Sequence, residues 1–186
     1  MHRIVAGLSV WCAIFLIGTA ALGLLSDRPA PDAAASAGGV WFERHFLAGI
    51  FSSVFALVVH GIVMTWFLAM GGFVKEGGRI LGGAAAEAFR LRSRRIKMRA
   101  FPPATFAPVA VVVTAVVGGA TGGAIASPGW HGVLAVATIL YNLHAFRKEY
   151  LAVVEQMALT RDVDAALAGQ EKRNREDART GGAVSG

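Results

Sequence analysis

Four histidines lie in long apolar stretches of this chain, where ionisable side chains are rare. His45 and His60 share one apolar segment, and His131 and His144 share another. An ionisable group inside a lipid bilayer is costly to bury and normally faces a bundle interior or a functional site. A neutral imidazole can ligate a metal ion through one ring nitrogen, and imidazoles also carry protons. The sequence therefore indicates that any chemistry of this protein is carried by these histidines.

The segments that hold these histidines are long enough to cross a membrane. The chain has 186 residues, and with 55% hydrophobic and 16% charged residues it is too apolar for an ordinary soluble domain. A helix needs about 20 apolar residues to span the hydrocarbon core. Residues 4–25, 46–73, 106–126 and 129–146 meet or approach this length. We expect an all-α fold, an integral membrane bundle of four transmembrane helices within residues 1–150.

The first apolar segment, residues 4–25, has a second interpretation as a cleaved signal peptide. Arg3 gives it a positive start, and the small residues at 33–37 would suit a cleavage site. However, the apolar run exceeds the roughly 7–15 residues of a typical signal peptide. We therefore expect this segment to remain in the protein as a membrane anchor.

The distribution of basic residues predicts the orientation of these helices. Residues 74–105 form a connecting loop with many more basic than acidic residues, whereas the loop before residue 46 has slightly more acidic ones. The positive-inside rule places the basic loop and both termini in the cytoplasm, so we expect a multi-pass protein of the inner (cytoplasmic) membrane. The net charge of +6 mostly reflects this topology and does not indicate nucleic-acid binding. Residues 151–186 are expected to continue as a cytoplasmic helix and to end in a polar disordered tail after about Gly169.

Two further patterns concern contacts of the helices. Arg90, Arg94 and Lys97 recur at helical spacing, which suits a short helix on anionic lipid head groups, although a solvated loop would explain them equally. The glycines at 118–119 and 122–123 let another helix or a flat ligand approach the backbone of the third segment closely.

Helical rise places the histidines at two depths in the membrane. His60 follows His45 by 15 residues and His144 follows His131 by 13 residues, which correspond to about 22 and 19 Å along a helix. If the two helices run parallel, His45 lies level with His131, and His60 lies level with His144.

On these positions, within WFERHFLAGIFSSVFALVVHG and PGWHGVLAVATILYNLHAF, the chain resembles the membrane cytochromes b. In that family two helices of a four-helix bundle each carry two histidines, and two b-type haems stacked between them exchange electrons with quinones. The resemblance is one of architecture and covers about residues 4–148. It implies haem b as cofactor, a quinone and partner subunits of a membrane complex, and Arg44 near a haem propionate. The implied iron ligands are His60, His144, His45 and His131.

The spacings depart from the family pattern of about 14 residues on both helices. At about 100° per residue, a step of 13 turns His144 about 140° away from His131, so a regular helix points them to nearly opposite faces. The histidine spacings are therefore more consistent with one bound haem or none than with two. We prefer His60 with His144 as the ligand pair, because both lie away from the outer membrane boundary and neither depends on an irregular first helical turn. His45 with His131 is the second choice.

Other interpretations stay open. His45 and His131 could be ordinary interfacial residues, and His144 could form a hydrogen bond near the inner interface. His60, near the middle of its segment, is harder to explain without a role as haem ligand, quinone contact or proton relay. A structural or assembly subunit, or a transporter of protons or metal ions, would fit the same four helices. Because the sequence motifs of common enzyme classes are absent, we expect no catalytic activity of its own.

Overall fold

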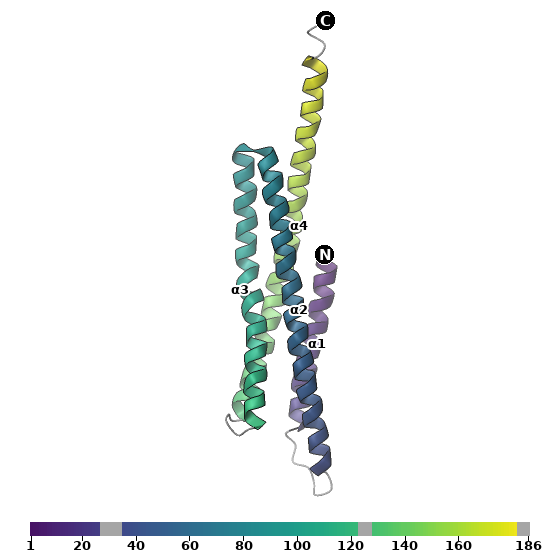
Figure 1. Ribbon diagram of the computed structural model, residues 1–186, viewed down its shortest axis with the longest axis vertical. Coiled ribbons are helices and arrows are strands. Elements are labelled where there is room, and N and C mark those ends of the chain that lie inside the picture. Colours follow the sequence, from purple (N-terminus) through teal and green to yellow (C-terminus); the bar gives the residue numbers. More distant parts are fainter. Residues whose placement is uncertain (27–34, 123–127, 182–186) are drawn as a thin grey trace. The chain divides into compact units, whose positions relative to one another are not determined.

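The computed structural model describes residues 1–26, 35–122 and 128–181, and these residues form four α-helices. The helices are α1 (His2–Ser26), α2 (Ala35–Leu81), α3 (Gly83–Gly122) and α4 (Pro128–Gly181), drawn in Figure 1. The all-α prediction is therefore confirmed. Part of the expected cleavage region at 33–37 and the end of the third segment lie outside the described residues.

Three of the four described helices contain stretches that are long and apolar enough to cross a membrane. These stretches are His2–Leu25, Val40–Leu81 and Gly83–Gly119. Many large apolar side chains on these helices are exposed, including Leu68 and Val116, as expected for surfaces that face lipid. The chain is thus a membrane protein. The first half of α4 is less apolar because it carries His131, Asn142 and His144.

The structure divides into two compact units. Unit 1 consists of Met1–Met64 and Ala100–Tyr150, and unit 2 consists of Thr65–Arg99 and Leu151–Gly186. All four helices contribute to unit 1, whereas α2, α3 and α4 contribute to unit 2.

Unit 1 is a bundle whose core takes side chains from each of its four helices. The buried cluster consists of Cys12 and Leu16 from α1, Ala56 and Val59 from α2, Val111 from α3 and Phe146 from α4. Several buried positions are alanines, such as Ala107 and Ala145, which let the helices approach closely. Figure 1 shows α1 beside the N-terminal part of α2, and a hydrogen bond of 2.8 Å joins the Thr19 and Ser52 hydroxyls of these helices.

Unit 2 corrects the expectation of a basic loop at residues 74–105. α2 continues to Leu81 and α3 begins at Gly83, so a helical hairpin replaces the loop (Figure 1). At the turn, Gly82 and Gly83 adopt positive φ angles of 69° and 56°, a conformation that glycine adopts without steric penalty. The segment after the turn is rich in alanine and arginine, which are good helix formers, and this accounts for the extra helix.

The hairpin of unit 2 packs against the second half of α4. Val74 of α2, Ile96 of α3 and Val163 of α4 are buried. Two exposed ion pairs also join α3 to α4, with N–O distances of 2.7 Å for Arg92–Asp162 and 3.2 Å for Arg99–Glu155. The buried apolar contacts therefore provide most of the stability of this packing, because exposed ion pairs contribute little.

The C-terminal part of α4 also differs from the prediction. The helix extends to Gly181, beyond Gly169, where a disordered tail was expected. Ion pairs one helical turn apart, Lys172–Glu176 and Glu171–Arg175, favour helix in this polar segment. Composition alone indicated disorder because the segment has few apolar side chains, whereas the charge spacing favours helix.

Candidate functional site

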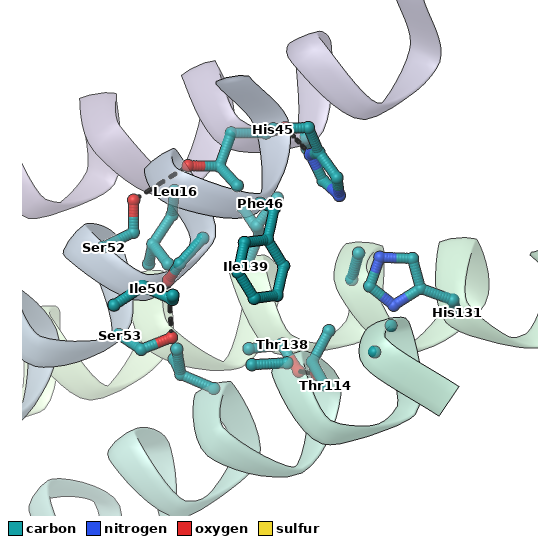
Figure 2. A pocket seen from close by; sticks show the side chains of 18 of the residues that line it. Leu16, His45, Phe46, Ile50, Ser52, Ser53, Thr114, His131, Thr138 and Ile139 are labelled. Carbon is teal, nitrogen blue, oxygen red and sulfur yellow. Dashed lines mark hydrogen bonds between the residues drawn. The ribbon is translucent and has the colours of Figure 1, made fainter. Parts of the chain in front are cut away.

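Unit 1 contains a pocket of about 120 Å³ that is lined by residues from α1, α2, α3 and α4 (Figure 2). Two of the predicted site residues, His45 and His131, belong to its lining. Their ring centres lie 5.9 Å apart and their planes are inclined by 72°. The structure therefore brings together two histidines that are 86 positions apart in the sequence, from α2 and α4.

Hydrogen bonding determines which nitrogen of His45 carries a proton. His45 Nδ1 lies 2.9 Å from the backbone carbonyl oxygen of Thr19 on α1. A carbonyl oxygen can only accept a hydrogen bond, so Nδ1 must be the protonated donor. In the neutral ring, the lone pair then remains on Nε2. A metal-ligating histidine commonly has this arrangement, with one N–H held by a carbonyl and the other nitrogen available to the metal.

At Nδ1, the ring of His131 lacks a hydrogen bond of the kind that His45 forms with a described residue. Its Nδ1 atom is buried and has no hydrogen-bond partner among the described residues. A buried polar atom without a partner carries a free-energy penalty, so such an atom needs an explanation such as a missing ion, water or ligand. His131 is therefore a second candidate for binding a ligand in this pocket.

Glycines on the facing helices make room for both rings. A Cβ atom at Gly23 of α1 would lie 3.0 Å from His45 Cε1, and one at Gly118 of α3 would lie 2.6 Å from His131 Cε1. The second distance is far shorter than a carbon–carbon contact of about 3.5–4.0 Å. Gly118 is thus required for the observed position of the His131 ring.

The donor set of the pocket fits a metal ion that has imidazole ligands on two opposite sides. With metal–nitrogen bonds of about 2.0–2.1 Å, the centres of two such rings lie about 6 Å apart. His45 and His131 already have this spacing. The pocket is smaller than the roughly 300–1,000 Å³ of typical cofactor sites. Phe46 and Ile50, which form part of its wall, are half exposed.

His60 occupies a different site, which is fully buried in unit 1. Its Nδ1 lies 2.6 Å from Glu149 Oε1, and its Nε2 lies 3.2 Å from Asn142 Oδ1. The ring stacks on Phe146, with centres 5.0 Å apart and planes inclined by 10°. Both nitrogens of His60 are therefore engaged by side chains of α4, and neither is directed at a pocket.

The structure does not bring together the ligand pair that sequence reasoning preferred. His60 contacts Glu149 and Asn142, whereas His144 is exposed and its ring is stacked with Tyr141 at 6.5 Å. α4 is helical from Pro128 onward, so His131 and His144 point to different sides, as their helical phase predicts. The second choice, His45 with His131, is the pair whose rings lie next to each other, in an edge contact.

Arg44 lies beside this pair in sequence but not in the pocket lining. Its guanidinium carbon lies 5.1 Å from the ring centre of Trp41, and the side chain is exposed. This is a cation–π contact on the surface of α2. A propionate contact by Arg44, which the resemblance implies, would require the side chain to leave Trp41.

Sequence reasoning did not identify Glu149, which lies three residues beyond the predicted fourth segment. One signal could have identified it. Asn142, Glu149 and Gln156 recur every seven residues along α4, and all three are fully buried. A spacing of seven returns to nearly the same face of a helix, so polar residues at this spacing mark a polar stripe on its inner side.

No group of three or more histidine, cysteine or acidic side chains that could hold a metal ion occurs in the described part of the chain. Comparison with protein-family models, with curated proteins and with solved structures gives no match to this chain. The two histidine sites are therefore the features of the described residues that point to a function.

Proposed function

We propose that this protein is a small membrane subunit that holds one haem b between His45 and His131 and passes electrons between a quinone and a partner subunit. The observation that carries this proposal is the pair of neighbouring imidazoles in a pocket, each with a glycine of another helix next to its ring. Haem bound in this way supplies reversible one-electron chemistry, and two histidine ligands leave no open iron position for oxygen.

The surrounding residues have defined roles in this proposal. The Thr19 carbonyl fixes the orientation of the His45 ring and keeps the Nε2 lone pair available. A hydrogen bond of this kind also makes the ligating nitrogen more basic. Gly23 and Gly118 provide the space that lets the rings lie against the facing helices.

We further propose that the first half of α4 is a fourth membrane crossing. Its polar side chains Asn142 and Thr138 are buried inside unit 1, and His131 lines the pocket. These three side chains therefore do not prevent the other faces of the helix from contacting lipid. An even number of crossings places both termini on one side. The basic residues of the α2–α3 hairpin support a cytoplasmic location for that side and an inner-membrane location for the chain.

The basic residues of unit 2 are expected to contact anionic lipid head groups. Arg90, Arg94 and Lys97 of α3 line a small pocket together with Lys75 of α2 and the hydroxyl-bearing Ser93. No acidic side chain is part of this lining. Its positive charge suits a phosphate group at the membrane surface.

The proposal is tested by oxidised and reduced visible spectra of the detergent-purified protein, with haem quantified per chain after expression in a haem-replete host. We expect one b-type haem in the wild type and none in His45→Ala or His131→Ala. His144→Ala is the matched control, because it removes an exposed histidine from the same helix, and it should retain the haem.

Two results would contradict this assignment. Loss of haem in His60→Ala with full retention in His45→Ala would place the ligand at His60 instead. A colourless but well-folded wild-type protein would exclude the haem and leave a structural or assembly role, for which the exposed charged surface of unit 2 is the supporting feature.

A further inference from the structure

The His60–Glu149 pair is a buried ionisable group that the haem proposal does not use. The exposed fractions of the two side chains are 1% and 0%, and their closest atoms lie 2.6 Å apart. Placing such a pair in a bundle interior is expensive, because the desolvation penalty can exceed the attraction between the charges. Packing alone would be served better by apolar residues, so the pair calls for a functional explanation.

The hydrogen-bond partners determine how many protons the pair holds. Asn142 Nδ2 donates to the Thr138 carbonyl at 2.9 Å and to the Ala107 carbonyl at 3.4 Å, so Asn142 Oδ1 must be an acceptor. His60 Nε2 therefore carries a proton and donates it to Oδ1. One further proton lies between His60 Nδ1 and Glu149 Oε1. The pair is electrically neutral as a whole, whichever of these two atoms holds that proton.

Glu149 also offers a place for an additional proton. Its second oxygen, Oε2, is buried and has no hydrogen-bond partner among the residues that the structure describes. On α1, the buried Cys12 is a titratable group that interacts electrostatically with Glu149. Over Ala100–Gly122 the sequence of α3 contains no titratable side chain, and those of α4 nearby, such as His144 and Arg147, are exposed. A second proton would make the pair +1, and no other charged side chain among the described residues is fully buried to balance it.

A short polar path links this pair to the pocket. Asn142 bonds to the Thr138 carbonyl one helical turn away, and the Thr138 hydroxyl lies 2.7 Å from that of Thr114. Thr114 and Thr138 both line the pocket that contains His45 and His131. A change of charge in the pocket therefore acts on His60–Glu149 through buried dipoles, where electrostatic interactions are strong.

We propose that His60 and Glu149 form an internal proton-binding site. The site takes up one proton when the haem proposed for the neighbouring pocket would be reduced by one electron. The electron comes from a reduced quinone or a chemical reductant, and the proton comes from bulk water. The pair changes from neutral to +1 while the pocket gains one negative charge, so the bundle interior keeps its net charge. The arrival of the electron depends on the proposed function, whereas the proton site itself does not.

The proton site is tested by infrared difference spectra of the purified protein between acidic and alkaline pH, recorded in H2O and in D2O. At pH values where exposed carboxyls remain ionised, we expect a carboxylic-acid C=O band that shifts in D2O in the wild type and is absent in Glu149→Gln. The glutamine amide can donate to His60 Nδ1, so this variant keeps the hydrogen bond. Glu43→Gln, which removes an exposed carboxyl from unit 1, should keep the band. An unchanged band in Glu149→Gln would overturn the proposal.

If Glu149→Gln does not fold, ¹⁵N-histidine NMR of the wild-type protein tests whether His60 and Glu149 share a proton. We expect one histidine with a protonated Nε2 and with a strongly deshielded proton at Nδ1, as in a short hydrogen bond to a carboxylate. A histidine spectrum without such a ring would contradict the shared proton.

Coupling to the electron is tested separately by redox titration of the haem-loaded protein at several pH values. One proton per electron shifts the midpoint potential by about 59 mV per pH unit. We expect a slope approaching this value in the wild type and a nearly flat dependence in Glu149→Gln with haem retained. An unchanged slope in the variant would overturn the coupling. Absence of haem would overturn the proposed function, while the infrared result would still decide whether the proton site exists.

Discussion

Two histidine sites in unit 1 differ in how their ring nitrogens are occupied. In the pocket, His45 has one nitrogen held by a carbonyl and His131 has a buried nitrogen without a described partner. At the second site, both nitrogens of His60 bond to side chains of α4. The histidines of the pocket thus have a nitrogen available for a ligand, whereas His60 has both nitrogens in hydrogen bonds and shares a proton with Glu149. The hydrogen-bond partners of a membrane histidine, rather than its depth in the bilayer, therefore indicate its chemistry.

The largest effect on stability is expected at the second site. Replacing Glu149 by alanine leaves His60 without its buried partner, and breaking such a pair typically costs about 3–5 kcal/mol of unfolding free energy. Glu149→Gln keeps a hydrogen bond and should cost no more than about 1–2 kcal/mol. Unfolding in detergent measures both values, with His144→Ala as the control that should change stability by less than about 0.5 kcal/mol. If Glu149→Ala were as stable as this control, the two histidine sites would not differ as described.

An intermediate effect is expected at the wall of the pocket. Gly118→Ala puts a Cβ atom 2.6 Å from His131 Cε1, so the ring must move, and overpacking of this kind typically costs about 1–3 kcal/mol. We also expect fewer haem groups per chain in this variant. Gly7→Ala is the control, because Gly7 lies outside the pocket lining and a Cβ atom there has no neighbour within 4 Å. Equal haem content in the two variants would show that the position of His131 is unimportant for binding.

The smallest effect is expected for an ion pair on the surface of unit 2. Arg92 and Asp162 lie 2.7 Å apart, yet both side chains are exposed. Arg92→Ala should lower the free energy of unfolding by at most about 1 kcal/mol, and the loss should shrink at high salt concentration. Its haem content should equal that of the wild type. A loss as large as that of Glu149→Ala would mean that burial does not decide the strength of these pairs.

The sequence was sufficient to predict the apolar helical segments and the opposite directions of His131 and His144. Both predictions depend on local properties, namely apolar length and the angle per residue along a regular helix. Helical rise also predicts that His45 and His131 lie at the same depth, although the sequence favours this pair only second. Depth favours His60 with His144 as the ligand pair, because depth takes no account of the hydrogen-bond partners of each ring.

The identity of the His60 partner could not be read from local sequence alone. Glu149 follows Arg147 and Lys148, so its neighbours in the sequence indicate a solvated segment. Its burial depends on which face of α4 packs against the other helices of unit 1, and this is a tertiary property. The hairpin of unit 2 was missed for a related reason, because basic residues determine orientation in a membrane and do not by themselves exclude helix.

The glycine turn at Gly82–Gly83 has a consequence for the order in which the protein is made. Contacts between α2 and α3 next to this turn join residues that are close in sequence, so the hairpin can form while the ribosome is still synthesising the rest of the chain. Its partner in unit 2 comes last, since Arg92 meets Asp162 only after 70 more residues have been added. Until then, the contacts of Asp162 with Arg92 and of Val163 with Gly77 cannot form. A chain truncated before Asp162 would therefore keep the hairpin without these contacts to α4.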